Sequence, residues 1–428
     1  MTMGVGTGAW RRSPAIVAVL AANAISGAGN VLTSVAMPWL IIERGGAGAE
    51  IGLIGFATLL PLLFGALVAG IIVDRIGGRA ASVVSDLASG GTIAAIGLLA
   101  LAGWLPLWLL AALAFLGTVL DMPGATGRSV LLPALAERDG VDLAAVNGMS
   151  ETVRRLTILA GPLLSGVLVV AVGPELTMLV DAVTFAVSTV LVAIWVPRMA
   201  VAHEARQAWR LRDAVALLWR DRLIRSLMAV SGTVNVLLNP IFFVLLPLYV
   251  VATGGVAADQ GLLVAAFGVG TLTGALGSAR LVRRFGRRPV LTVGVAVAGL
   301  SPFLLAAAPS LPVAAVAQVL SGLGIGPVGP IVLTVLGTRV KPEVRGRVFG
   351  AHTTIVNAAI PIGVVVTGFV AELVDVRLIL VGISTLFAAT VLPLLLQPAL
   401  AGLDAGGSAG SAGEEHVAEG PAPRAQQS

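Results

Sequence analysis

The chain has 428 residues, of which 57% are hydrophobic and only 11% are charged, against about 25% charged residues in ordinary soluble domains. A soluble fold cannot bury that much apolar surface, and the apolar runs are about twenty residues long, enough to cross a ~30 Å hydrocarbon layer as helix. Strands of a membrane barrel would alternate apolar and polar residues, whereas these runs are continuous, so helices remain. Cysteine is absent, which excludes disulfides, thiolate metal sites and cysteine nucleophiles.

Breaks at proline, glycine and clustered charge predict twelve membrane-spanning helices in two sets of six. The first apolar run is too long for a signal-peptide core and is expected to remain as the first helix. The first set is expected near residues 14–42, 51–73, 80–101, 106–130, 145–172 and 175–196. The second set is expected near residues 225–252, 260–282, 289–308, 311–336, 348–371 and 378–397.

This order of elements predicts four regions: a six-helix bundle over 1–196, a linker over 197–224, a second bundle over 225–400 and a tail over 401–428. The linker interleaves arginine with leucine, valine and tryptophan, which is typical of a basic amphipathic segment on the cytoplasmic membrane surface. A solvated linker without membrane contact is the alternative. The tail is rich in Gly, Ala, Ser, Glu and Pro without periodicity, so disorder is expected.

The basic residues are unevenly distributed between the predicted loops. Most of the 27 fall on one side of the twelve helices, together with both termini, while the opposite loops hold Arg44 and Arg377. Positively charged loops stay in the cytoplasm, so both termini are expected there, in a multi-pass protein of the bacterial inner membrane. The net charge of +5 then reflects topology and gives no reason to expect nucleic-acid binding.

The two halves of the sequence repeat one element. When the second half is placed on the first, the run Arg75, Gly77 and Arg79 falls on Arg284, Gly286 and Arg288. Parallel repeats of six helices that rock around a site at the membrane midplane are an architecture of secondary transporters.

The loop after the second predicted helix carries a recognisable motif. The segment Gly70-Ile-Ile-Val-Asp74-Arg75-Ile-Gly77-Gly78-Arg79 resembles the signature Gly-x-Leu-x-Asp-Arg-x-Gly-Arg-Arg/Lys of the major facilitator superfamily, with only Gly78 departing in its charged part. The resemblance implies an all-α polytopic membrane protein with twelve helices in two six-helix bundles. It also implies that the loop is a latch between the halves on the cytoplasmic side in the outward-facing state. A mere topology anchor is the alternative. The latch residues are Gly70, Asp74, Arg75, Gly77 and Arg79.

The fifth predicted helix resembles the antiporter motif of drug-exporting members, with Thr157 and Ser165 at two of its five glycine positions. Stretches at 121–133, 145–148, 180–185 and 345–348 resemble the branch that contains macrolide exporters and the enterobactin exporter. These resemblances imply export of a small organic molecule coupled to proton entry. The matching residues of the antiporter motif are Gly148, Gly161, Pro162 and Gly166.

Ionisable residues inside a bilayer are costly and mark transport pathways by default. Asp121 lies well inside the fourth predicted helix, and Arg128 is two helical turns further on, so the two are expected on one face as a pair that rearranges during proton coupling or as a fixed ion pair. Glu151 reaches Arg154 and Arg155 at i+3 and i+4, which favours a structural or gating charge cluster over the proton site. Its expected place near the cytoplasmic surface keeps it hydrated, so Glu151 is the second candidate for proton coupling.

Two further acids, Asp86 and Asp181, are assigned to structural support, because the third and sixth helices are peripheral in the family. Uncharged polar residues on the first, seventh and tenth helices are candidates either for the substrate cavity or for hydrogen bonds between helices. They are Asn23, Asn30, Asn235, Asn239 and Gln318, with Phe242 and Phe243 as possible stacking or packing residues.

Nothing in the sequence indicates catalysis. Lys341 is the only lysine and no glycine-rich phosphate loop precedes it, and the three histidines are scattered, so neither ATP hydrolysis, a metal site nor a cofactor is expected. The expected function is secondary export of a small amphiphilic molecule by proton antiport, with the proton gradient as energy source and the bilayer as surroundings, by a monomer. The alternatives are an importer or facilitator, and a receptor that has lost transport.

Overall fold

The computed structural model describes residues 13–199, 216, 218–340, 345–396 and 403. Within these residues eleven helices are long and apolar enough to cross a membrane, and a bent pair, Gly48–Leu63 with Val68–Ile76 at 56°, brings the number to twelve. The predicted all-helical polytopic fold is therefore confirmed. Most of the predicted linker and nearly all of the predicted tail lie outside the described residues.

The first half begins where Ser13 accepts a hydrogen bond from the backbone N–H of Ile16, a cap that satisfies one of the free donors of the first turn. Its second spanning segment is longer than predicted and is broken by a 3₁₀ turn that carries a proline, which cannot donate a helical hydrogen bond. Its helices are α1 (Pro14–Glu43), α2 (Gly48–Leu59), η2 (Leu60–Leu63), α3 (Gly65–Ile76), α4 (Gly78–Leu101), α5 (Leu107–Asp139), α6 (Leu143–Val172) and α7 (Pro174–Trp195).

The second half repeats this order with three interrupted spans. The π-helical turn η3 follows Pro240, and glycine and proline separate the two segments of the tenth span. Its helices are α9 (Arg222–Pro240), η3 (Ile241–Leu245), α10 (Leu246–Ala252), α11 (Ala257–Phe285), α12 (Arg287–Ala306), α13 (Leu311–Ile325), α14 (Val328–Arg339), α15 (Arg345–Asn357), α16 (Ile360–Leu373) and α17 (Val376–Leu396).

The sequence repeat corresponds to a repeated turn. Gly77 and Gly286 have φ of +82° and +87°, a conformation that L side chains rarely adopt, and each joins two helices directly. Beyond each turn an arginine donates to carbonyl oxygens near the end of the last helix of its bundle: Arg79 to Ala193 at 2.6 Å and Arg288 to Leu394 at 3.0 Å. The two arginines therefore anchor equivalent helix ends.

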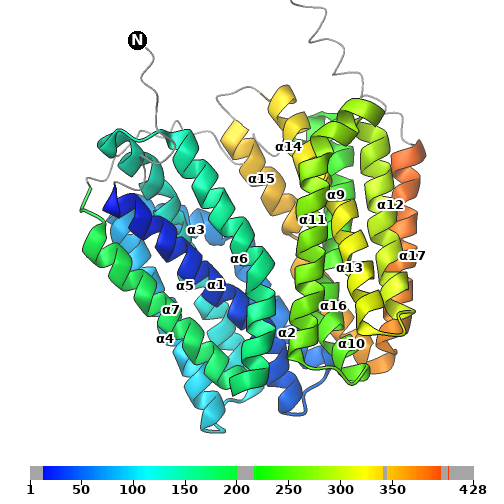
Figure 1. The fold of residues 1–428 in the computed structure, drawn as a ribbon, viewed down its shortest axis with the longest axis horizontal. Coiled ribbons are helices and arrows are strands. Elements are labelled where there is room, and N and C mark those ends of the chain that lie inside the picture. The colour runs from blue at the N-terminus through cyan, green and yellow to red at the C-terminus, as the bar shows by residue number, and fades with distance from the viewer. Residues whose placement is uncertain (1–12, 200–215, 217, 341–344, 397–402, 404–428) are drawn as a thin grey trace, which may run out of the picture.

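The two bundles meet through α6 with α11 and through α2 with α16. Glycines allow the close approach: a Cβ on Gly166 would overlap the carbonyl oxygen of Ala257, and one on Gly52 would lie 2.9 Å from Cα of Gly368. These contacts lie toward the end formed by the loops after α1 and α10. Figure 1 shows α6 and α11 diverging toward the other end, where α3 and α14 lie.

Candidate functional site

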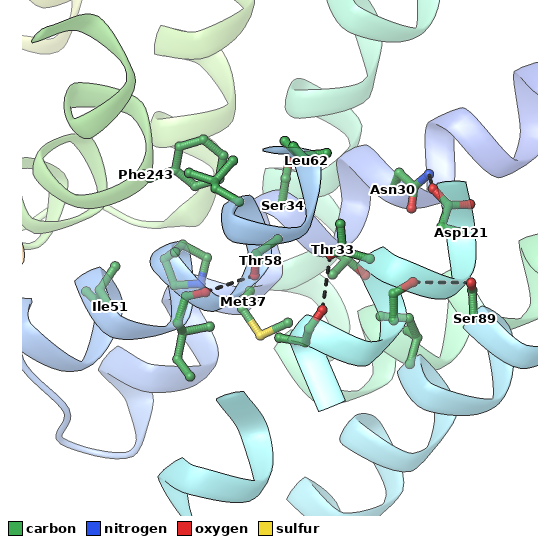
Figure 2. A pocket seen from close by; sticks show the side chains of 18 of the residues that line it. Asn30, Thr33, Ser34, Met37, Ile51, Thr58, Leu62, Ser89, Asp121 and Phe243 are labelled. Atoms are coloured by element: carbon green, nitrogen blue, oxygen red, sulfur yellow. Dashed lines mark hydrogen bonds between the residues drawn. The ribbon is translucent and has the colours of Figure 1, made fainter. Parts of the chain in front are cut away.

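A cavity of about 240 Å³ lies among α1, α2 and α5, with Phe243 of η3 on its far side (Figure 2). Its wall is mostly apolar, and its polar groups come chiefly from α1 and α5. Such an apolar cavity with a few polar groups is typical of small-molecule sites. The polar lining residues are Asn30, Thr33, Ser34, Thr58, Ser89, Thr118 and Asp121.

Asp121 is the only acid among the described residues that line this cavity. Its Oδ2 accepts a hydrogen bond of 3.1 Å from the side-chain amide of Asn30, and the two side chains face each other in Figure 2. Its Oδ1 is buried and has no hydrogen-bond partner in the described part of the chain. The carboxyl group therefore has one oxygen without a hydrogen-bond partner among the described residues, which can carry a proton.

The expected pairing of Asp121 with Arg128 is wrong in this structure. The Arg128 guanidinium instead lies 2.7 Å from the carboxylate of Asp86 on α4, and their side chains are 3% and 0% exposed. Seven residues do return to the same face of α5, but the long arginine side chain reaches across to α4. Asp121 is left with the neutral amide of Asn30 as its hydrogen-bond partner.

Further hydrogen bonds hold the pair of Arg128 and Asp86 in place. The Nε of Arg128 donates to Asn23 at 2.7 Å, so Asn23 orients this arginine, and the hydroxyl of Ser188 on α7 donates to Asp86 at 2.6 Å. The remaining contacts of Arg128 are with Ser82 and Ser26, at 3.2 and 3.3 Å. The network joins α1, α4, α5 and α7, which fits the predicted supporting role of Asp86.

Asp181 on α7 is fully buried beside the same helix α1. It accepts hydrogen bonds from the hydroxyls of Thr33 at 2.5 Å and Thr184 at 3.1 Å. A Cβ on Gly29 would overlap its Oδ1, so only glycine fits there. Asp181 thus fixes the packing of α1 against α7, which fits the predicted supporting role.

A second cavity, of about 480 Å³, lies between the bundles and is lined from α6, η3, α11, α13 and α14. Arg154 and Arg155 both line it, and both donate to Glu151 at 2.7–2.8 Å, which confirms the predicted contacts at i+3 and i+4. Phe242 and Phe267 line it from the second bundle, with ring centroids 4.6 Å apart.

The other polar candidates take different positions. Asn235 and Asn239 line a third cavity of about 270 Å³ together with Asn357, while their amide groups donate to backbone carbonyls one turn back. Gln318 is only 2% exposed, and its amide nitrogen has no partner among the described residues. It is therefore a buried polar group and not an exposed cavity residue in this conformation.

The antiporter motif packs α6 against α1 of its own bundle and, at Pro162 and Gly166, against α11 of the other bundle. A Cβ on Gly161 would lie 2.8 Å from Val31 of α1, and Ser165 donates to the carbonyl of Leu32. On the other face of α6, the carbonyl oxygen of Pro162 would overlap a Cβ on Gly261 of α11. Gly148, at the other end of α6, has open space around it.

A hydrogen bond that the sequence did not reveal joins the bundles at the same contact. The indole N–H of Trp39 on α1 donates to the side-chain carbonyl of Gln260 on α11 at 2.5 Å, and both residues are buried. Only the polarity of Gln260 near a helix start hinted at it, because a single sequence does not show which helices meet.

The latch motif lies at the turn between α3 and α4. Asp74 and Arg75 are exposed, and Gly70 and Gly77 are partly exposed near the end of α3, while Arg79 is bound to α7 of its own bundle. A cavity of about 360 Å³ beside this loop is lined by Asp74 and by Arg198. The latch role, which concerns the outward-facing state, stays a prediction.

Residues 8–418 match a family model described as transmembrane secretion effector. The multidrug efflux pump Tap of Mycobacterium tuberculosis is 32% identical over 404 residues, which cover 92% of this chain and 95% of that protein. Tap of Mycolicibacterium fortuitum is 32% identical over 395 residues, or 90% and 94% of the two chains.

Solved structures show the same fold at lower identity. The nucleoside transporter NupG superposes with a TM-score of 0.73 at 16% identity, over 90% of this chain and 99% of that one. A bacterial homologue of the iron transporter ferroportin, solved in an inward-facing state, gives a TM-score of 0.65 at 15% identity, over 89% and 96%.

Proposed function

Because the chain belongs to the transmembrane secretion effector family of the major facilitator superfamily, we propose that it exports small amphiphilic organic molecules by proton antiport with alternating access. It is a multi-pass membrane transporter of small molecules and not an enzyme. The similarity to Tap multidrug efflux pumps along almost the whole of both chains supports export of drug-like molecules.

The shape of the molecule supports alternating access. The bundles touch at one end through glycine-lined contacts and diverge toward the other (Figure 1). If the arginine-rich loops are cytoplasmic, as the charge distribution predicts, this conformation is open to the cytoplasm and closed to the outside. We place both termini in the cytoplasm, in the bacterial inner membrane, and propose that a monomer carries out the cycle.

The observation that carries the coupling proposal is the position of Asp121. Asp121 lines the cavity and keeps one carboxylate oxygen without a partner among the described residues. Arg128, which was expected beside it, pairs with Asp86 instead. A carboxyl group in such a place can hold a proton when neutral and release it when the cavity becomes wetter or a cation approaches. Proton entry through Asp121 would then drive the return step of the exporter.

The coupling is tested with the full chain in proteoliposomes under an imposed pH gradient. Three fluorescent amphiphiles serve as probes: anionic 1-anilinonaphthalene-8-sulfonate, neutral N-phenyl-1-naphthylamine and cationic ethidium. Wild type should accumulate at least one of them against its gradient, whereas Asp121→Asn should lose this accumulation and retain downhill exchange. Glu151→Gln is the comparison, because Glu151 is already neutralised by two arginines.

Accumulation that persists in Asp121→Asn and fails in Glu151→Gln would move the coupling role to α6. Accumulation that persists in both variants would exclude both carboxylates. Failure of wild type to move any of the three probes would contradict export of amphiphiles.

A further inference from the structure

The cavity between α6 and α11 is lined by residues that have no part in the proposed coupling role of Asp121. Its described lining includes two arginines and no acidic residue, and all its other members are apolar except Thr271. Fixed charge in the membrane-spanning part of a helix is costly, so its presence on a cavity wall requires a reason.

The arginines lie at the boundary of the apolar part of α6, because no charged residue follows them up to the helix end at Val172. Arg155 is twelve residues into α6, so it lies about 18 Å along the helix axis from the first residue, Leu143. The tight contact of α6 with α11 runs from Gly166 beside Ala257 to Leu159 beside Gly268. Arg154 and Arg155 follow within about one turn, where the helices separate and the cavity begins.

The charge of this cluster is not balanced. Arg154 binds the carboxylate of Glu151 through two nitrogens at 2.8 Å, and Arg155 binds it through Nε at 2.7 Å. One carboxylate therefore serves two guanidinium groups, and the cluster keeps one net positive charge. Both arginine side chains remain accessible, at 61% and 44% exposed, so donors are left for a further acceptor.

The opposite wall offers apolar and aromatic surface. Phe242 is on the π-helical turn and Phe267 is on α11, with their rings inclined by 59°. Ile158 and Leu159 continue the apolar surface on the α6 side, next to the arginines. A ligand that satisfies both walls has a flat or apolar body and an acidic group at one end.

We propose that this cavity is a substrate subsite for organic anions, in which Arg154 and Arg155 bind a carboxylate or sulfonate while the apolar body lies against Phe242 and Phe267. The proposal rests on the proposed export function and specifies its substrate class. Glu151 competes with the substrate for the two arginines, so it limits the affinity of the subsite for anions. Because the two walls belong to different bundles, the subsite exists only while α6 and α11 keep this arrangement.

The test measures binding, so that it does not depend on proton coupling. Full-length protein in phosphatidylcholine nanodiscs is titrated with 1-anilinonaphthalene-8-sulfonate and with N-phenyl-1-naphthylamine, which have similar aromatic bodies and differ in the sulfonate. The double variant Arg154→Gln/Arg155→Gln should lose about tenfold in affinity for the sulfonate and leave that for the neutral probe unchanged. Glu151→Gln should raise the affinity for the sulfonate severalfold, which a merely structural role would not do.

The matched control is Arg283→Gln/Arg284→Gln, which removes the same charge near the end of α11, away from the cavity. This variant should bind both probes as wild type does. Equal loss of sulfonate affinity in the control, or no loss in the Arg154/Arg155 variant, would overturn the proposal. A wild-type affinity that falls to the variant's value in phosphatidylglycerol nanodiscs would assign the cluster to a lipid headgroup and also overturn it.

Discussion

Arg128 on α5 and Asp86 on α4 form a buried salt bridge, with a guanidinium nitrogen 2.7 Å from each carboxylate oxygen. This pairing decides the chemistry of the cavity, because it removes the one arginine that was expected beside Asp121. Three acids of the first bundle therefore differ by partner: Asp86 has an arginine, Asp181 has two threonine hydroxyls, and Asp121 has an asparagine amide and one oxygen without a partner among the described residues.

The buried pair gives the first prediction. Asp86→Asn should lower the free energy of unfolding by about 3 kcal/mol or more, because it leaves Arg128 buried without a counter-charge. The double variant Asp86→Leu/Arg128→Met should recover most of that loss. Unfolding in mixed detergent micelles measures both. Glu151→Gln, at an exposed ion pair, should cost at most about 1 kcal/mol, and a similar cost for Asp86→Asn would show that the pair is not desolvated.

The second prediction concerns the packing of α1 against α7. Gly29→Ala would place a Cβ that overlaps Asp181 Oδ1 and Thr184 Oγ1, and Asp181 is fully buried, so its side chain cannot move into solvent. We expect a loss of about 2 kcal/mol in unfolding free energy from overpacking. Gly27→Ala on the same helix meets only Thr157 at 3.6 Å and should be tolerated. Equal stability of the two variants would contradict the close contact of these helices.

The third prediction concerns the contact between the bundles. Trp39→Phe removes the hydrogen bond between Trp39 and Gln260. The population in which the two bundles are separated at this end should then rise about fivefold, the effect expected for the loss of one hydrogen bond. The chain has no cysteine, so spin labels on cysteines introduced at Ala47 and Val256 report the separation directly. Trp108→Phe, at a residue 70% exposed, is the control. Identical distance distributions in all three proteins would show that the bond does not hold the bundles together.

The fourth prediction concerns pH and the start of α9. Burial acts to raise the pKa of Asp221, but Arg339 at 2.8 Å and the backbone N–H groups of Ile224 and Leu223 outweigh it and hold the pKa below its ordinary value of 3.8. Because the pKa of Asp221 is lower in the folded than in the unfolded state, its carboxylate stabilises the folded state at pH values above the unfolded-state pKa. That stabilisation is lost as the pH falls through the folded-state pKa.

The contribution of Asp221 to the free energy of unfolding should therefore stay constant between pH 7 and pH 5 and decline below about pH 4. Asp221→Asn should be less stable than wild type at pH 7 by at most about 1 kcal/mol, since the ion pair is partly exposed, and the difference should vanish in acid. Thermal melting followed from pH 7 to pH 3 measures it. If the difference in stability between the two proteins grew on acidification, the pKa of Asp221 would be raised by folding and not lowered.

The sequence by itself determined the number and order of the helices, the repeated halves and the membrane as surroundings. These follow from local properties: apolar runs long enough for a bilayer, breaks at glycine and proline, and the repeated Arg75 and Arg284 loops. Contacts within one helix could also be predicted from the sequence, as for Glu151 with Arg154 and Arg155, because helical spacing determines which side chains meet at i+3 and i+4.

Only the tertiary structure decided which helix each polar side chain faces. Spacing placed Arg128 on the face of Asp121, but the choice between Asp121 and Asp86 depended on the position of α4, which no local pattern encodes. The same holds for Trp39 with Gln260 and for the cavity between Arg154 and Phe267, since their partners are far apart in the sequence. In hydrocarbon a polar group gains most from the nearest partner, so the arrangement of helices selects the pairs.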